Sequence, residues 1–160
     1  SKIKSIITSS GGSKPKVYKL DGIITAAAIS SNREVWAAGS SKGDLIIRSV
    51  KEKTKKILKN FSQDNCAIAK IEFFGSNGIL VSSEKKILRL NFKASTMSID
   101  LTTSHIFPGY TQILGFEIMK EKHPYVLGIS TQDSLHVTVL HENGENSHLA
   151  SIPKPQDITD

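Results

Sequence analysis

The strongest constraint on the fold of this sequence is a repeated alternation of short strand-like runs and turns. Three segments each contain four short runs of apolar and β-branched residues, separated by turns of Gly, Asn, Asp, Ser and Pro. The segments open at Ile24, Ala67 and Thr111, so they follow one another at steps of 43 and 44 residues. This pattern predicts an all-β fold built from three four-stranded antiparallel sheets.

Units of four strands at a period of about 40–45 residues are typical of the blades of a β-propeller. The innermost strands of the three blades are predicted near residues 24–30, 67–74 and 111–119. Several runs, such as "AAAI" and "LII", are apolar at consecutive positions, which is expected of a sheet that is covered on both faces. The predicted blades cover about residues 24–61, 67–101 and 111–153.

The predicted partial propeller spans residues 17–153. Residues 1–16 mix Ser, Gly and Lys and indicate a linker or a loosely held N-terminal strand, and residues 154–160 indicate a C-terminal tail. Closed propellers contain roughly 4–8 blades, so three blades predict a part of a larger propeller. The remaining blades would belong to a longer chain or to a partner subunit, because an open array leaves sheet edges that invite association.

A helical alternative exists for residues 22–38, where apolar residues also recur at helical spacing and alanine favours helix. The turn-forming residues Ser30, Ser31 and Asn32 interrupt this stretch. The other two segments contain comparable breaks, "GSNG" and "KEKHP", so strands are the preferred prediction.

The stretch "ITAAAISSNREVWAAGSSKGDLIIRSV" resembles a repeat of the WD40 family. Gly43 matches the glycine of the tight turn in that repeat, and residues 45–48 match the strand that follows. The Trp-Asp pair of the family would fall at Arg48 and Ser49 and is absent, and no segment contains the Gly-His pair. The resemblance covers about residues 17–153 and implies a WD40-like β-propeller segment. By analogy of fold, it also implies a non-enzymatic scaffold for protein–protein interactions in a multi-subunit intracellular assembly.

The stretch "GSSKGD" at residues 39–44 contains two glycines, but its spacing does not suit a phosphate-binding loop. A loop of the Walker A type needs four residues between its glycines. The second glycine is followed by Lys, then by Ser or Thr, and the chain then continues into a helix. Here three residues separate Gly39 from Gly43, Asp44 follows, and the next run is strand-like. A hairpin turn is therefore predicted.

The residue types of an enzyme or a metal site occur without the required pattern. Cys66 lies just before a predicted strand, and a catalytic cysteine needs a base and an orienting group beside it. Neither C-x-x-C nor H-E-x-x-H occurs among the cysteine and the five histidines. We therefore expect no catalytic residue, metal, cofactor or small-molecule substrate, and a propeller enzyme is the least supported alternative.

Positive charge is concentrated in the N-terminal part of the chain. Residues 1–61 contain 13 Lys and Arg against 4 Asp and Glu, whereas residues 62–160 contain 8 against 11. The densest stretch, "KEKTKKILK", predicts a solvated outer strand and turn, where lysines also discourage pairing between sheet edges. Its five lysines are the candidate contacts to a partner or to nucleic acid: Lys51, Lys53, Lys55, Lys56 and Lys59. The alternative function is therefore a basic propeller that contacts RNA or DNA in a nucleic-acid-processing particle.

Two aromatic residues in the loop "SHIFPGY", Phe107 and Tyr110, are a candidate contact for a protein partner. Exposed aromatics on loops often contribute much of a binding energy. The alternative is a loop that folds over the end of a blade. Trp36, the only tryptophan, lies within a predicted strand and is expected to pack between blades.

Three features bear on where the protein resides. No apolar run approaches the roughly 18 residues that a membrane-spanning helix needs, so no membrane span is expected. The single cysteine cannot form an internal disulfide, and the N-terminus lacks the continuous apolar core of a secretory signal. The expected location is intracellular, in the nucleus or the cytoplasm, with other protein subunits as partners.

Overall fold

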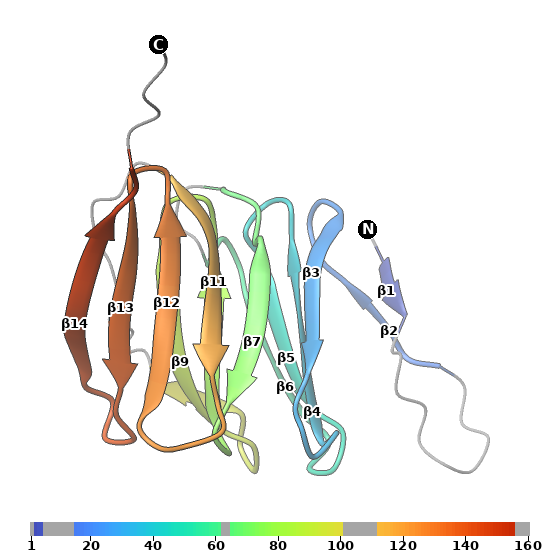
Figure 1. The fold of residues 1–160 in the computed structure, drawn as a ribbon. Coiled ribbons are helices and arrows are strands. Elements are labelled where there is room, and N and C mark those ends of the chain that lie inside the picture. The colour runs from blue at the N-terminus through green and yellow to red at the C-terminus, as the bar shows by residue number, and fades with distance from the viewer. Residues whose placement is uncertain (1, 5–14, 62–64, 101–111, 156–160) are drawn as a thin grey trace.

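The computed structural model describes residues 2–4, 15–61, 65–100 and 112–155. The described residues form strands and turns without a helix, and the strands build three four-stranded antiparallel sheets that stand side by side (Figure 1). A two-stranded sheet lies beside the first of them (Figure 1). This arrangement confirms the predicted all-β fold of three four-stranded sheets.

Each four-stranded sheet is a meander in which consecutive strands pair. The first sheet contains β3 (Ile24–Ile29), β4 (Val35–Ser40), β5 (Leu45–Ser49) and β6 (Thr54–Leu58). The second contains β7 (Lys70–Phe74), β8 (Gly78–Ser82), β9 (Ile87–Lys93) and β10 (Ser98–Asp100). The third contains β11 (Ile113–Met119), β12 (Tyr125–Thr131), β13 (Ser134–Leu140) and β14 (Asn146–Pro153). The small sheet pairs β1 (Lys2–Lys4) with β2 (Val17–Lys19).

The strands that open the three sheets, β3, β7 and β11, fall within the ranges that the repeat predicts. Residues 22–38 form β3, a turn and β4, so the helical alternative for this stretch is wrong. In the N-terminal segment, expected to be a linker or a loosely held strand, β1 pairs antiparallel with β2.

The turn between β4 and β5 accounts for the glycines at residues 39–44. The hydroxyl of Ser40 accepts hydrogen bonds from the backbone N–H groups of Lys42 and Asp44, at 3.3 and 3.2 Å. Gly43 has a φ of 83°, a left-handed conformation that glycine adopts at low cost. Because β5 begins at Leu45, the stretch is a hairpin turn, as predicted.

The apolar core between the first and second sheets consists of side chains that project from both. Ala37 and Ile47 of the first sheet meet Ile71 and Ile79 of the second, and all four are buried. Gly39 permits a close approach here, because a Cβ atom at this position would lie 2.6 Å from the Cβ of Ile68. The complete burial of one aliphatic side chain contributes about 1.5–3 kcal/mol, so this core holds the two sheets together.

A second core joins the second and third sheets. Leu80 and Ile87 of the second sheet pack with Phe116 and Leu127 of the third. The apolar runs of β8 and β9 therefore have neighbours on both faces, which explains why these runs do not alternate with polar residues.

The far face of the first sheet is covered in part by the segment that contains β2. Tyr18 and Leu20 pack against Trp36 and Ile46, and the Tyr18 and Trp36 rings meet edge to face with centroids 5.5 Å apart. Trp36 is 6% exposed, so it packs within the fold, as expected from the sequence.

The "AAAI" run departs from the expectation that both of its faces are covered. Ala26 and Ala28 pack against the core that the first two sheets share. Ala27 and Ile29 point the other way and are exposed. The cluster that contains Tyr18 and Leu20 reaches β4, β5 and β6 and includes Ile24 at the start of β3, but it leaves Ala27 and Ile29 exposed.

Candidate functional site

The five candidate lysines lie at the outer edge of the first sheet, as the sequence predicts. Lys51 and Lys53 occupy the turn between β5 and β6, Lys55 and Lys56 lie on β6, and Lys59 follows that strand. All five residues are exposed. β6 is the last strand of its sheet, so these lysines line an edge that has no paired neighbour among the described strands.

Side chains on β6 alternate between the two faces of the sheet. The ammonium group of Lys55 lies 5.3 Å from the ring centroid of Tyr18, and Lys55 pairs across the strands with Arg48. Lys56 pairs with Ile47, whose side chain belongs to the core on the opposite face. Lys51 forms an exposed ion pair with Glu34 at 3.5 Å. The structure therefore places the lysines along one edge and divides them between two faces.

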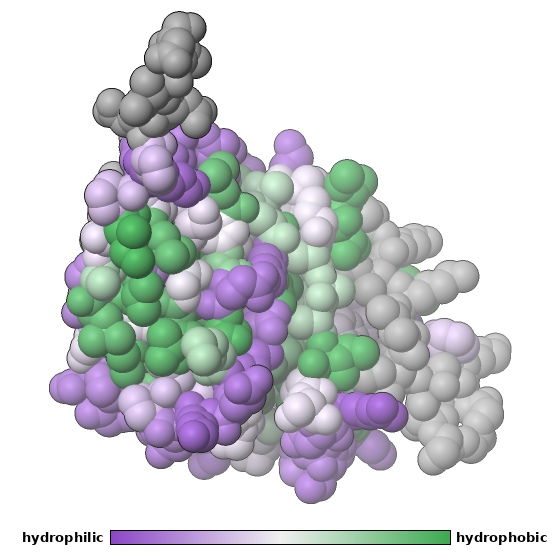
Figure 2. Space-filling model, in the orientation of Figure 1, coloured by the Kyte–Doolittle hydropathy of each residue, from purple (hydrophilic) through white to green (hydrophobic). Residues whose placement is uncertain are grey.

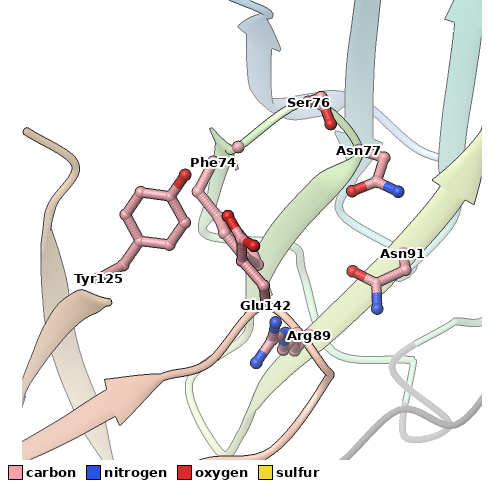
Figure 3. A pocket seen from close by; sticks show the side chains of 8 residues that line it. Phe74, Ser76, Asn77, Arg89, Asn91, Tyr125 and Glu142 are labelled. Carbon is pink, nitrogen blue, oxygen red and sulfur yellow. The ribbon is translucent and has the colours of Figure 1, made fainter. Parts of the chain in front are cut away.

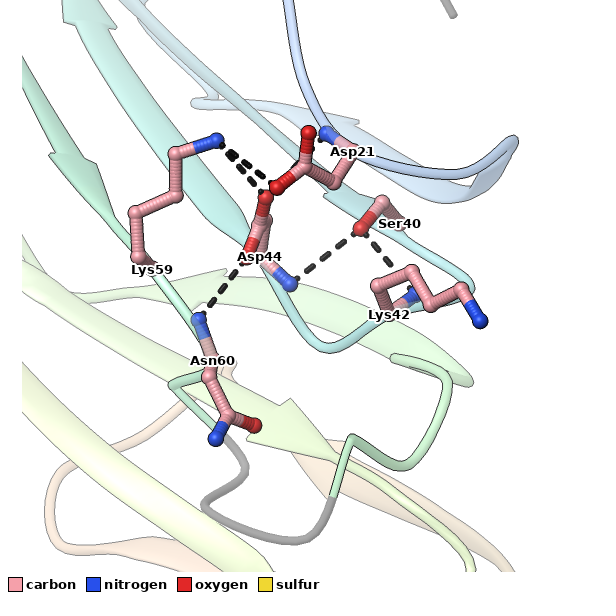
Figure 4. A network of polar contacts seen from close by, with 6 residues as sticks. All are labelled: Asp21, Ser40, Lys42, Asp44, Lys59 and Asn60. Atoms are coloured by element: carbon pink, nitrogen blue, oxygen red, sulfur yellow. Dashed lines mark hydrogen bonds and ion pairs between the residues drawn. The ribbon is translucent and has the colours of Figure 1, made fainter.

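Lys59 differs from the other four lysines because it belongs to a polar network around Asp44 (Figure 4). Its ammonium group lies 3.1 Å from Asp44 Oδ2 and 3.4 Å from Asp21 Oδ2. The backbone N–H of Asn60 donates to Asp44 Oδ1 at 2.8 Å, and that of Asp21 donates to Oδ2 at 3.1 Å. The network connects the β4–β5 turn to the segment before β3 and to the end of β6.

The charges of this network stabilise each other. Burial by itself raises the pKa of the Asp44 carboxyl, whose side chain is 4% exposed. Hydrogen bonds from the Asn60 N–H, the Lys59 ammonium group and the Asp21 N–H outweigh burial and hold this pKa below its usual value of 3.8. The pKa of Lys59 is raised, chiefly by its hydrogen bond to Asp44. Lys59 therefore has a structural partner.

The other predicted contact residues, Phe107 and Tyr110, lie outside the described residues. Their proposed role as a partner loop stays a prediction.

A large apolar surface lies on the third sheet, on the face that points away from the second sheet; we call it the open face. Figure 2 shows apolar side chains gathered over this sheet. Five large apolar residues of the sheet are between 38 and 63% exposed. They are Leu114, Met119, Leu135, Leu149 and Ile152.

The geometry of β13 and β14 explains this surface. Leu135 pairs with Ile152 and Val137 pairs with Ala150, so these residues share one face. His136 and Thr138 project to the other face, toward the second sheet, and are buried. The corresponding faces of the first and second sheets are covered by the next sheet along the chain. No described residue covers the open face of the third sheet.

A pocket of about 270 Å³ lies between the second and third sheets (Figure 3). Phe74 and Tyr125 line one side, with ring centroids 5.7 Å apart. The turn between β7 and β8 and the side chain of Asn91 line the other side. Arg89 of β9 lies at the inner end, and Glu142 of the β13–β14 turn lies at the mouth.

Arg89 connects the two sheets beneath this pocket. Its Nη1 donates to the carbonyl oxygen of Glu145 at 3.2 Å and to Asn146 Oδ1 at 2.9 Å, and its Nη2 donates to the carbonyl oxygen of His141 at 2.5 Å. The guanidinium carbon also lies 5.2 Å from the ring centroid of Phe74. Arg89 is 4% exposed, and burial lowers its pKa from the usual value.

Neither the open face nor the pocket is predicted by the sequence analysis, although each has a sequence signal. The run "SLHVTVL" alternates aliphatic with polar residues, which predicts one apolar face. The run "KILRLNF" places Arg89 between leucines, which marks a buried cation that needs partners.

Two further findings concern the described residues. They contain no group of three His, Cys, Asp or Glu side chains arranged to hold a metal ion. They also form no helix with the length and apolarity needed to cross a membrane.

Three repeated four-stranded sheets, packed face to face in chain order, form a segment with the WD40-like β-propeller fold. The structure is similar to the crystal structure of the β-propeller domain of Cps50 (Swd1) from Myceliophteria thermophila, with a TM-score of 0.53 and 12% sequence identity. The match covers 95% of this chain and 52% of that domain, so the chain spans about half of its length. No protein-family model matches the sequence, and no curated protein matches it.

Proposed function

We propose that this chain is a non-enzymatic part of a larger β-propeller, which serves as a protein-interaction scaffold in a multi-subunit intracellular assembly. The observation that carries the proposal is the open face, where five large apolar side chains of one sheet are exposed. Contiguous apolar surfaces of this kind mark interaction sites on folded proteins. The occupant we propose is the face of a further four-stranded blade.

The packing inside the molecule supports this choice of occupant. The second sheet covers the first, and the third covers the second, through aliphatic and aromatic side chains. A further blade on the third sheet would extend the same arrangement. The five side chains of the open face are already about half buried, so complete burial would contribute roughly 1 kcal/mol each, or about 5 kcal/mol together.

The other end of the array supports the same proposal. β1 and β2 form only two strands, and they lie where a neighbouring blade of the first sheet would stand (Figure 1). Ile29 is 48% exposed and Ile23 is 67% exposed. Two inner strands added to β1–β2 would cover this region and complete a four-stranded blade. The source of the further strands is the remainder of a longer chain or a partner subunit.

Site-specific photo-crosslinking tests the proposal in the assembled protein. A photoreactive amino acid at Leu135 should crosslink to an apolar strand of another blade, and mapping of the crosslinked peptide identifies its source. The same group at Lys56, on the exposed edge of β6, is the matched control. Absence of crosslinks from Leu135, or crosslinks only to solvent-exposed loops, would contradict the proposed occupant.

A second candidate function is contact with RNA or DNA through the edge of β6. It is favoured by the exposure of Lys51, Lys53, Lys55 and Lys56 along one edge. Ion pairing of Lys59 with Asp44 makes that residue a weaker candidate than the other four. Crosslinks from Lys56 to RNA in the same experiment would support this function.

A further inference from the structure

In the pocket between the second and third sheets, the buried charge of Arg89 forms no ion pair with another described residue. The guanidinium group of Arg89 has five N–H bonds, and three hydrogen bonds to neutral oxygen atoms are formed. Its buried Nε has no hydrogen-bond acceptor. In the part of the chain that the structure describes, no carboxylate lies within ion-pair distance of Arg89. A buried charge in this situation favours an anion beside it.

The wall of the pocket carries further hydrogen-bonding groups that are available to a ligand. The side-chain amides of Asn77 and Asn91 and the hydroxyl of Tyr125 line the pocket. Among the described residues, none of these three groups forms a side-chain hydrogen bond. Together they offer hydrogen-bonding groups on both sides of the pocket (Figure 3).

We infer that this pocket binds a carboxylate group presented by a protein partner. This inference rests on the proposed function as an interaction scaffold and names the chemistry that one of its surfaces recognises. A volume of about 270 Å³ suits a single residue rather than a larger ligand. The source of the carboxylate is an acidic side chain or the C-terminus of a partner chain. In either case its two oxygen atoms can accept hydrogen bonds from the side-chain amides of Asn77 and Asn91, and the nearby charge of Arg89 attracts it.

Glu142 sets the selectivity of the pocket for a group of low negative charge. Its side chain lies at the mouth and is 77% exposed, and its carboxylate lies 3.4 Å from His123 Nε2. A ligand of higher negative charge, such as a phosphate dianion, would experience stronger repulsion from Glu142 than a carboxylate does. Removal of this charge should therefore strengthen the binding of any anion.

The test uses small probes and the complete propeller. N-acetyl-aspartate N-methylamide represents an acidic side chain, N-acetylglycine represents a C-terminus, and N-acetyl-asparagine N-methylamide is the neutral control. Binding is followed by NMR through the side-chain amide signals of Asn77 and Asn91. We expect saturable shifts with at least one carboxylate, at a Kd on the order of 1–10 mM for so small a ligand.

Variants that leave the inter-sheet contacts of Arg89 in place complete the test. Glu142→Gln should lower the Kd of the bound carboxylate about threefold or more, and Asn91→Ala should raise it by a similar factor. Lys56→Ser, far from the pocket, should leave it unchanged. The inference is overturned by shifts that do not saturate, by equal shifts with the neutral probe, or by an unchanged Kd in Glu142→Gln. None of these results depends on the open face, so they leave the proposed blade contact untouched.

Discussion

The polar network around Asp44 shows how one residue holds three segments of the first sheet. Its carboxylate accepts hydrogen bonds from Asn60 and Asp21 and pairs with Lys59, while its own N–H donates to Ser40. The sequence places Asp44 after a turn glycine but does not indicate this role. The partners of its carboxylate lie 15 to 23 residues away along the chain and meet it only in the folded state.

We predict that Asp44→Asn destabilises the protein by about 1–3 kcal/mol, because buried N–H donors lose a charged acceptor. The pKa of Asp44 is lowered by folding, so its contribution is present above pH 3.8 and is lost as the pH falls through the pKa of the folded state. Urea unfolding at several pH values from neutral downward measures this effect. Asp133→Asn, an exposed control, should change stability by about 0.5 kcal/mol or less. Equal stability of the Asp44 variant and the parent would contradict the assigned role.

At the scale of elements, the repeat predicts the sheets because its signals are local. Turn residues stop each run, and the constant spacing of the runs sets the size of each sheet. The pocket is not predictable in this way, since Arg89 and its acceptor in His141 are 52 residues apart. The open face is likewise a property of neighbours, because the alternation of β13 indicates an apolar face without showing what covers it.

The pairing of β13 with β14 carries a pH-dependent contact. His136 is buried on β13, its Nδ1 lies 3.0 Å from Ser151 Oγ, and burial together with the nearby His148 lowers its pKa below 6.5. The unfolded chain therefore takes up a proton first, so this contribution to stability is complete above pH 6.5 and declines below it. We predict that unfolding free energies fall between about pH 7 and pH 5, and that His136→Gln reduces this dependence. A pH dependence identical in the variant would refute the prediction.

The exposed edge of β6 gives a prediction for the alternative function. Replacement of Lys51, Lys53, Lys55 and Lys56 by Ser should weaken any RNA binding and flatten its salt dependence. The slope of the logarithm of the binding constant against the logarithm of the salt concentration should change by about 0.7 for each single-strand phosphate that the lysines no longer neutralise. A salt titration of RNA affinity measures this in the complete propeller, with Lys85→Ser and Lys93→Ser as controls. Unchanged affinity and slope would exclude this edge as a nucleic-acid contact.

At the scale of the whole molecule, the two ends of the array are different. The first sheet is partly covered by the segment that contains β2, whereas the third sheet exposes its open face. Contacts between unlike ends are heterologous, so copies of such an array can add to one another without forming a closed pair. The open face, which we propose a further blade covers, therefore makes the isolated chain prone to association.

Sedimentation velocity of the purified chain over a range of concentrations tests this account most directly. We predict concentration-dependent association that the double substitution Leu135→Lys and Ile152→Lys strongly reduces, because both residues lie opposite each other on the open face. The double substitution Lys53→Ser and Lys56→Ser, on the exposed edge, should leave the association unchanged. A parent chain that remains monomeric at every concentration and unfolds in one cooperative transition would contradict the claim that its third sheet requires a further blade.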